Sequence, residues 1–131
     1  MADQILVVPA ANDAGSGGAL RTAMRIFEQW HVRPNEAITL LAVPRATFYH
    51  WRNNPPRAQD LPRDTKERLS YVLGIYKALH ILLPQEDLAD GWLSRPNSAA
   101  PFNGERPLHR MLGGNVADLY EVRRYLDGMR G

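Results

Sequence analysis

Apolar residues recur at the spacing of amphipathic helices along most of the chain, and this pattern predicts an all-α fold. One helix is predicted over residues 19–30, and a second begins at Pro34 with Asn35 as its candidate N-cap. A third helix is predicted over residues 45–53, because Pro55 and Pro56 then stop it. The buried positions expected in these helices are Leu20, Ala23, Met24, Phe27, Trp30, Ala37, Ile38, Leu40, Leu41, Phe48 and Trp51.

Further helices are predicted downstream, over residues 65–83, 86–94, 107–112 and 116–129. Asp64 and Asn115 are candidate N-caps, and Pro107 stands at a first helical position, where its missing N–H costs no hydrogen bond. No alternating strand pattern of useful length appears. The inward-facing positions expected in these helices are Leu69, Val72, Leu73, Tyr76, Leu79, His80, Leu83, Leu88, Trp92, Leu93, Leu108, Val116, Leu119, Tyr120, Val122, Tyr125 and Leu126.

The first 18 residues lack helical periodicity, and residues 12–18 are rich in glycine and small polar residues. We expect residues 1–18 to form a flexible tail. The alternative is a short strand over residues 5–8, formed against a partner. The apolar runs of the chain are far shorter than the ~20 residues of a membrane helix, and no basic segment precedes the first of them. We therefore expect a cytoplasmic protein with no membrane partner.

The composition is that of an ordinary globular protein, with 131 residues, 44% hydrophobic and 23% charged. The absence of cysteine excludes disulfides, thiolate metal sites and a cysteine nucleophile. The net charge of +2 is small, but residues 19–57 hold six arginines against two glutamates. From residue 61 onward, ten basic residues face nine acidic ones. Positive charge is thus concentrated in the first third of the chain, which favours contact with a phosphate backbone there.

Residues 35–52 have the pattern of a helix-turn-helix motif. Leu41 and Val43 are expected to fill the angle between its two helices, and Phe48 and Trp51 to anchor the second one. The alternative is a three-helix scaffold used for packing or dimerisation, because Ile38 and Ala42 replace the small residue and the glycine usual in the motif. The residues expected on the outer, DNA-facing side are Arg45, Ala46, Tyr49, His50 and Asn53, while Arg52, with Arg21 and Arg25, is expected to hold the DNA backbone.

These outer residues differ in what they are suited to contact. Arg45 and Asn53 match guanine and adenine edges respectively, and Arg52 suits the phosphate backbone. Tyr49 and His50 suit either bases or phosphates. The motif therefore predicts a DNA-binding unit over residues 19–57.

A second motif lies in the C-terminal half. It consists of Trp92-Leu93, Pro96-Asn97, Phe102, Gly104 and Pro107-Leu108. Its order resembles the pattern of the C-terminal toxin-binding domain of Xre/MbcA/ParS-type antitoxins, over roughly residues 61–131. Most of these side chains are expected to pack in the core, and Asn97 to satisfy the backbone of its own loop. The resemblance implies a helix-turn-helix unit followed by a small helical toxin-binding domain.

The resemblance also implies partners. Antitoxins of this family neutralise RES-domain toxins, which destroy NAD, by covering the entrance to the active site, and they bind the promoter of their own operon. The chain is thus expected to be the antitoxin of a type II toxin–antitoxin system, acting as a homodimer within a larger complex with toxin and promoter DNA. The alternatives are a free-standing helix-turn-helix regulator whose C-terminal helices dimerise, and a small adaptor that does not contact DNA.

The end of the last predicted helix is the expected toxin-inserting element. Its apolar stripe thins after Leu126, and Gly128 weakens the helix by about 1 kcal/mol relative to alanine. Guanidinium groups there suit a cleft that accepts phosphates, although they could equally complement the helix dipole. The candidate toxin-binding residues are Arg123, Arg124, Met129, Arg130 and Gly131.

Nothing in the sequence predicts catalysis, a metal site or a cofactor. The histidines at positions 31, 50, 80 and 109 fall in four different elements, without metal-ligand spacing or a glycine-rich phosphate loop. His80 is expected to be a hydrogen-bonded histidine beside a core stripe. We therefore do not expect an enzyme.

Overall fold

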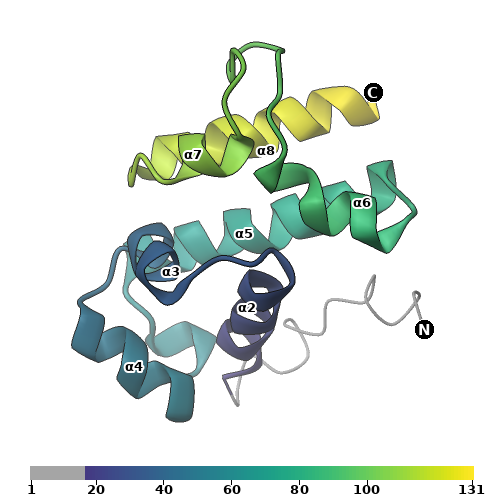
Figure 1. Ribbon diagram of the computed structural model, residues 1–131. Coiled ribbons are helices and arrows are strands. Elements are labelled where there is room, and N and C mark those ends of the chain that lie inside the picture. The colour runs from purple at the N-terminus through teal and green to yellow at the C-terminus, as the bar shows by residue number, and fades with distance from the viewer. Residues whose placement is uncertain (1–16) are drawn as a thin grey trace.

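The computed structural model describes residues 17–131, which form α-helices and short 3₁₀ helices (η) without any strand (Figure 1). The helices are α2 (Gly18–Gln29), α3 (Pro34–Leu41), α4 (Arg45–Asn53), η3 (Ala58–Asp60), α5 (Arg63–Leu82), α6 (Glu86–Gly91), η4 (Trp92–Ser94), α7 (Pro107–Met111) and α8 (Val116–Arg130). The all-α fold is confirmed. Residues 1–16 of the tail expected over residues 1–18, with its possible strand, lie outside the described residues; at Gly18 the expectation is wrong, because α2 begins there.

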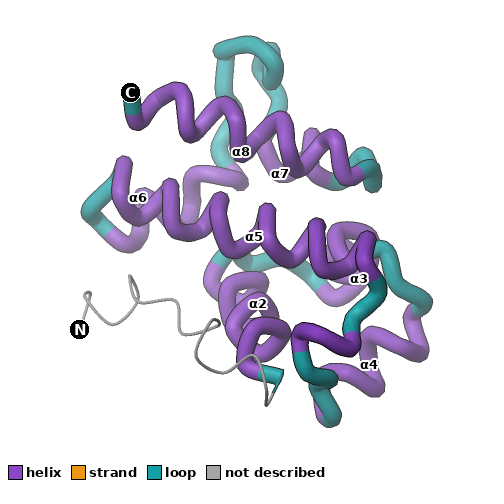
Figure 2. The backbone as a smooth tube through the Cα atoms, turned by 180° about the vertical axis from the view of Figure 1, so that it is seen from behind, coloured by secondary structure: helices purple, strands orange, loops and turns teal. Residues whose placement is uncertain are grey.

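Helix α5 occupies the middle of the fold. Helices α2 and α3 pack against one side of it and α8 against the other, as both views of the backbone show (Figures 1 and 2). A helix covered on more than one side needs apolar residues around most of its circumference. Val72, Ile75, Ala78 and Leu79 of α5 are fully buried, and they join the apolar residues of the other helices in one continuous core.

The first turns of the helices explain two wrong N-cap predictions. Arg33, not Asn35, is the N-cap of α3, because Pro34 takes the first helical position. The Arg33 N–H donates to Oε1 of Glu36 at 2.9 Å, so the helix end is already capped. Asp64 likewise lies inside α5, which begins at Arg63.

Ionic and polar contacts also stabilise the starts of α5 and α8. Asp64 accepts a hydrogen bond from Nε of Arg68 at 2.9 Å, and Arg68 also donates to the Leu40 carbonyl of α3 at 3.4 Å. Asn115 is the N-cap of α8, as predicted, and its N–H donates to Oδ2 of Asp118 at 3.1 Å. Arg68 therefore links the first turn of α5 to the end of α3.

Some residues expected in the core are exposed. Leu88 and Tyr120 are 41% and 47% exposed, and Trp51 is half-buried, whereas Phe48 is 3% exposed. Helix α4 packs against α3, and Phe48 is the residue of α4 that is buried. Tyr120 packs edge-on against Tyr71 of α5 at the rim of the α5–α8 contact, with ring centroids 6.0 Å apart. Phe48 is therefore the main residue that anchors α4 to the rest of the fold.

Helix α8 places a side chain against Gly74 of α5. The guanidinium group of Arg123 lies directly over this glycine, so that a Cβ there would collide with it. Nε of Arg123 donates to the Asp127 carboxylate one turn later, at 3.1 Å to Oδ2. A glycine inside a helix costs about 1 kcal/mol relative to alanine, and here its absent side chain makes room for Arg123.

A polar cluster is buried where α5 meets α6. Nε2 of His80 lies 3.0 Å from Oδ1 of Asp90, and the His80 ring packs against Tyr76 with centroids 4.2 Å apart. His80 is thus a hydrogen-bonded core histidine, as expected. Burial, followed by the negative charges of Asp90 and Glu86, raises the pKa of Tyr76 to about 12.

The raised pKa of Tyr76 predicts a pH dependence of stability. The folded protein favours the neutral phenol, while the unfolded chain titrates near pH 10. The stabilising contribution is therefore complete below pH 10 and is lost as the pH rises towards 12. We expect the wild-type protein to lose more stability over this interval than Tyr76→Phe, as measured by urea denaturation. Tyr120→Phe, at an exposed tyrosine, is the control; parallel profiles for wild type and Tyr76→Phe would contradict the prediction.

Candidate DNA-binding and toxin-binding surfaces

The turn between α3 and α4 sets the angle of the helix-turn-helix motif. Ala42 adopts a left-handed conformation with φ 56°, and its N–H donates to the Ile38 carbonyl at 2.8 Å. This conformation costs an alanine roughly 1–2 kcal/mol, so the packing around the turn must hold it. Leu40 and Leu41 supply that packing, since both are fully buried.

One side of α4 faces away from the molecule. Phe48, which lies between Arg45 and Arg52 in helical spacing, is buried and marks the inner edge of this side. Arg45 and Arg52 are seven residues apart, so they lie on one line of the helix about 10.5 Å apart along its axis. All the residues predicted to face DNA are exposed and lie on this helix: Arg45, Ala46, Tyr49, His50, Arg52 and Asn53.

The arginine at the end of α4 is held by aromatic rings. Cζ of Arg52 lies 5.6 Å from the ring centroid of Tyr49 and 6.0 Å from that of Phe48. The two rings meet edge-on at 5.2 Å. Such cation–π contacts orient a guanidinium group without removing its N–H donors. The two rings thus hold the Arg52 guanidinium group beside Tyr49 and Phe48, at a recess that Glu28 of α2 also lines.

The arginine at the start of α4 has a polar partner on α3. Nη2 of Arg45 donates to Oδ1 of Asn35 at 2.6 Å. Sequence analysis missed this pair, because the two residues are ten positions apart and meet only through the angle of the turn. The sequence analysis had instead assigned the Asn35 side chain to capping the N-terminus of α3.

The motif of the C-terminal half packs as predicted. Trp92 meets Phe102 edge-on at 5.8 Å and stacks on Tyr125 at 6.0 Å, while Leu93 and Leu108 are buried. Asn97 closes the loop that follows. Its side-chain Oδ1 accepts a hydrogen bond from the Ala99 N–H at 2.9 Å, and its main-chain carbonyl accepts one from the Gly104 N–H at 2.7 Å.

The five residues predicted to bind toxin differ in their surroundings. Arg123 packs on α5 and pairs with Asp127, and Nη1 of Arg130 lies 3.9 Å from the same carboxylate. Within residues 17–131, no ion pair holds Arg124, which is exposed. Met129 is 61% exposed, beyond the point where the inward stripe thins. Gly131 directly follows the end of α8.

A groove runs beside the end of α8. It has a volume of about 530 Å³ and is mainly apolar. Arg124 and Met129 lie on its α8 side, and Ala100 and Pro101 of the loop before α7 form the other side. The lining residues are Ala100, Pro101, Glu121, Arg124, Tyr125, Gly128 and Met129. The structure thus brings Arg124 and Met129 together at one recess and places Arg123 on the α5 side.

Residues 17–131, which the structure describes, hold neither a metal site nor a membrane span. No three histidine, aspartate or glutamate side chains gather there in an arrangement that could hold a metal ion. None of the helices in this part of the chain has the length and apolar character needed to cross a membrane.

Comparison with known proteins assigns both halves of the chain. Residues 10–74 match the antitoxin Xre-like helix-turn-helix domain, and residues 78–131 match the antitoxin Xre/MbcA/ParS C-terminal toxin-binding domain. A relative described as "Uncharacterized protein y4oB", from Sinorhizobium fredii (strain NBRC 101917 / NGR234), is 42% identical over 124 residues. That alignment covers 94% of this chain and 92% of the relative. The chain belongs to the Xre/MbcA/ParS-like family of antitoxins.

Proposed function

We propose that this antitoxin neutralises an NAD-degrading RES-domain toxin by covering its active site, and that it represses its own operon through α4. The match of residues 78–131 to a toxin-binding domain carries the first part of the proposal. The family resemblance supplies the RES type of toxin and the homodimer within a larger toxin–antitoxin complex. The exposed basic side of α4 supports the second part.

The end of α8 is the element proposed to reach into the toxin. Met129 is exposed, Arg124 makes no ion pair in the described part of the chain, and both border the groove beside α8. A guanidinium group and an apolar side chain at a helix end suit a cleft that accepts the phosphates and rings of a dinucleotide. Arg123 and Arg130 must first leave Asp127 to act in the same way.

The proposal is tested by expressing the chain with the product of the adjacent gene. We expect the neighbouring protein alone to deplete NAD and stop growth, and the pair to grow normally and to copurify. Light scattering on the purified complex should give two copies of the antitoxin. A harmless neighbour, together with retained promoter binding, would instead support a free-standing regulator with a C-terminal dimerisation domain.

The end of α8 predicts a separation of inhibition from binding. Deletion of residues 128–131 removes Met129 and Arg130 but keeps the contact between Arg123 and Asp127. We expect NAD hydrolysis by the toxin to resume while part of the affinity remains, because most of the helical surface is unchanged. Asp87→Ala, on the exposed side of α6, is the control. Full inhibition by the shortened protein would assign inhibition to the globular surface instead.

The two arginines of α4 predict different losses of DNA affinity. Arg45→Ala should weaken binding to the chain's own promoter by about 1–3 kcal/mol and relax sequence preference, as the loss of a base contact does. Arg52→Ala should weaken binding to all sequences alike and reduce the salt dependence, as the loss of a phosphate contact does. Gel shifts at several salt concentrations distinguish the two. Unchanged binding for both variants would contradict the assignment of α4.

A further inference from the structure

We propose that Asn35 is a positioning residue, which holds the guanidinium group of Arg45 in place for reading one base pair before DNA arrives. The inference deepens the proposed function, because it rests on DNA binding through α4. It assigns a role in sequence discrimination to a residue of α3 that precedes the turn of the motif.

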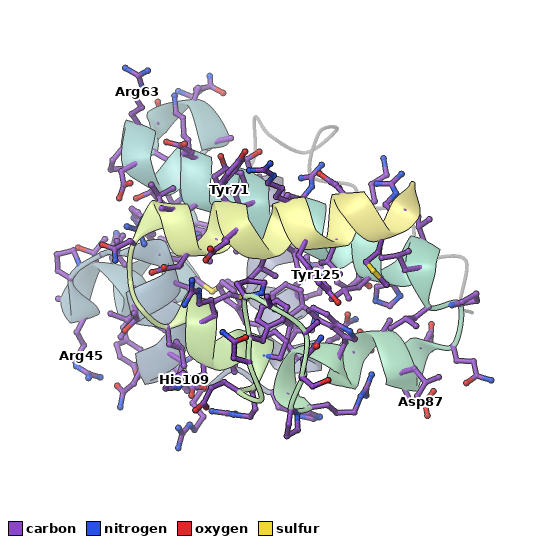
Figure 3. All side chains as sticks on the ribbon, turned by 90° about the horizontal axis from the view of Figure 1, so that it is seen from above. Arg45, Arg63, Tyr71, Asp87, His109 and Tyr125 are labelled. Carbon is purple, nitrogen blue, oxygen red and sulfur yellow. The ribbon has the colours of Figure 1, made fainter. Side chains whose placement is uncertain are left out.

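The geometry of the pair carries the proposal. Oδ1 of Asn35 accepts a hydrogen bond from Nη2 of Arg45 at 2.6 Å, a short distance even for a charged donor. Both residues are exposed, so the contact is not a by-product of core packing. In Figure 3 the Arg45 side chain stands at the edge of the molecule and extends away from the helices. The Arg45 guanidinium group is therefore held at Nη2, and its other nitrogen atoms are open to a partner.

Asn35 has no competing task in its own helix. Pro34 fixes the first helical position, and the Arg33 N–H is taken by Glu36 at 2.9 Å. Nearby, Oγ1 of Thr39 donates to the carbonyl of Asn35 at 3.3 Å, a contact of its main chain alone. The Asn35 amide is thus available to Arg45, while its position is set by the rigid start of α3.

The chemistry of the pair suits base reading. A guanidinium group has five N–H donors in a fixed plane, and Asn35 occupies one of them. The remaining donors still suffice for the two parallel hydrogen bonds that arginine makes with O6 and N7 of guanine. Because the long side chain is already restrained, it loses less conformational freedom when DNA binds. The Nδ2 donors of Asn35 also remain available for a phosphate oxygen.

The neutrality of asparagine is part of the same argument. An aspartate at this position would also accept from Arg45, and more strongly, but its negative charge would lie beside the phosphates. Asn35 provides the acceptor without that repulsion. Asn35→Asp therefore keeps the positioning contact and changes the charge alone, whereas Asn35→Ala removes the contact.

A double-mutant cycle with Asn35→Ala and Arg45→Ala tests the coupling on the wild-type promoter and on variants at single base pairs. We expect Asn35→Ala to lower affinity for the promoter about 3–10-fold in the wild-type background and less than about 2-fold in the Arg45→Ala background. The melting temperature should not change. Gln59→Ala, which removes an exposed amide on η3, is the control.

Two further readouts separate positioning from a structural role. Asn35→Asp should weaken binding to all sequences but retain the discrimination that Asn35→Ala loses. In the free protein, ¹⁵N relaxation of the Arg45 Nε–H group should show a more mobile side chain in Asn35→Ala than in wild type. An unchanged relaxation rate would overturn the proposal.

The outcomes also separate this inference from the proposed function. If the wild-type chain binds no promoter DNA, the proposed DNA binding fails and the inference with it. If Arg45→Ala weakens binding and Asn35→Ala does not, only the positioning role is overturned. Equal losses from Asn35→Ala in both backgrounds would assign Asn35 a separate contact and would also overturn it.

Discussion

The packing of α5 on both of its sides is the constraint on which the rest of the structure depends. Val72, Ile75 and Leu79 are fully buried along this helix, which contacts α2 and α3 on one side and α8 on the other. Arg68 ties its first turn to the end of α3, and Gly74 allows Arg123 of α8 to lie against it. The orientation of both partner surfaces therefore follows from one helix.

The two matched family regions meet inside α5, between residues 74 and 78. The parts proposed to contact DNA and toxin lie away from this helix, on the outer side of α4 and at the end of α8. Both contribute few side chains to the core, so core packing places little constraint on which residues stand there. Short polar contacts, such as that between Asn35 and Arg45, set these surfaces in place instead.

Periodicity alone predicted the helices, and local chemistry predicted the Asn115 cap and the loop role of Asn97, because these depend on near neighbours in the chain. Prediction from the sequence failed where an element distant in the chain decides whether a residue is buried or paired. Leu88 has apolar spacing but no helix covers it, and Tyr120 packs at a rim. The pairing of Asn35 with Arg45 depends on the angle of the turn, which helical spacing does not encode.

Native-state hydrogen exchange tests most directly whether one core supports both surfaces. If α5 joins the two units, amides in the middle of α2, α5 and α8, such as those of Ile26, Ile75 and Val122, should open together. Their opening free energies should equal that of global unfolding and fall equally with denaturant. Exchange of the Val122 amide at a lower opening free energy, with Ile26 and Ile75 still protected, would show that α8 unfolds by itself and would contradict this account.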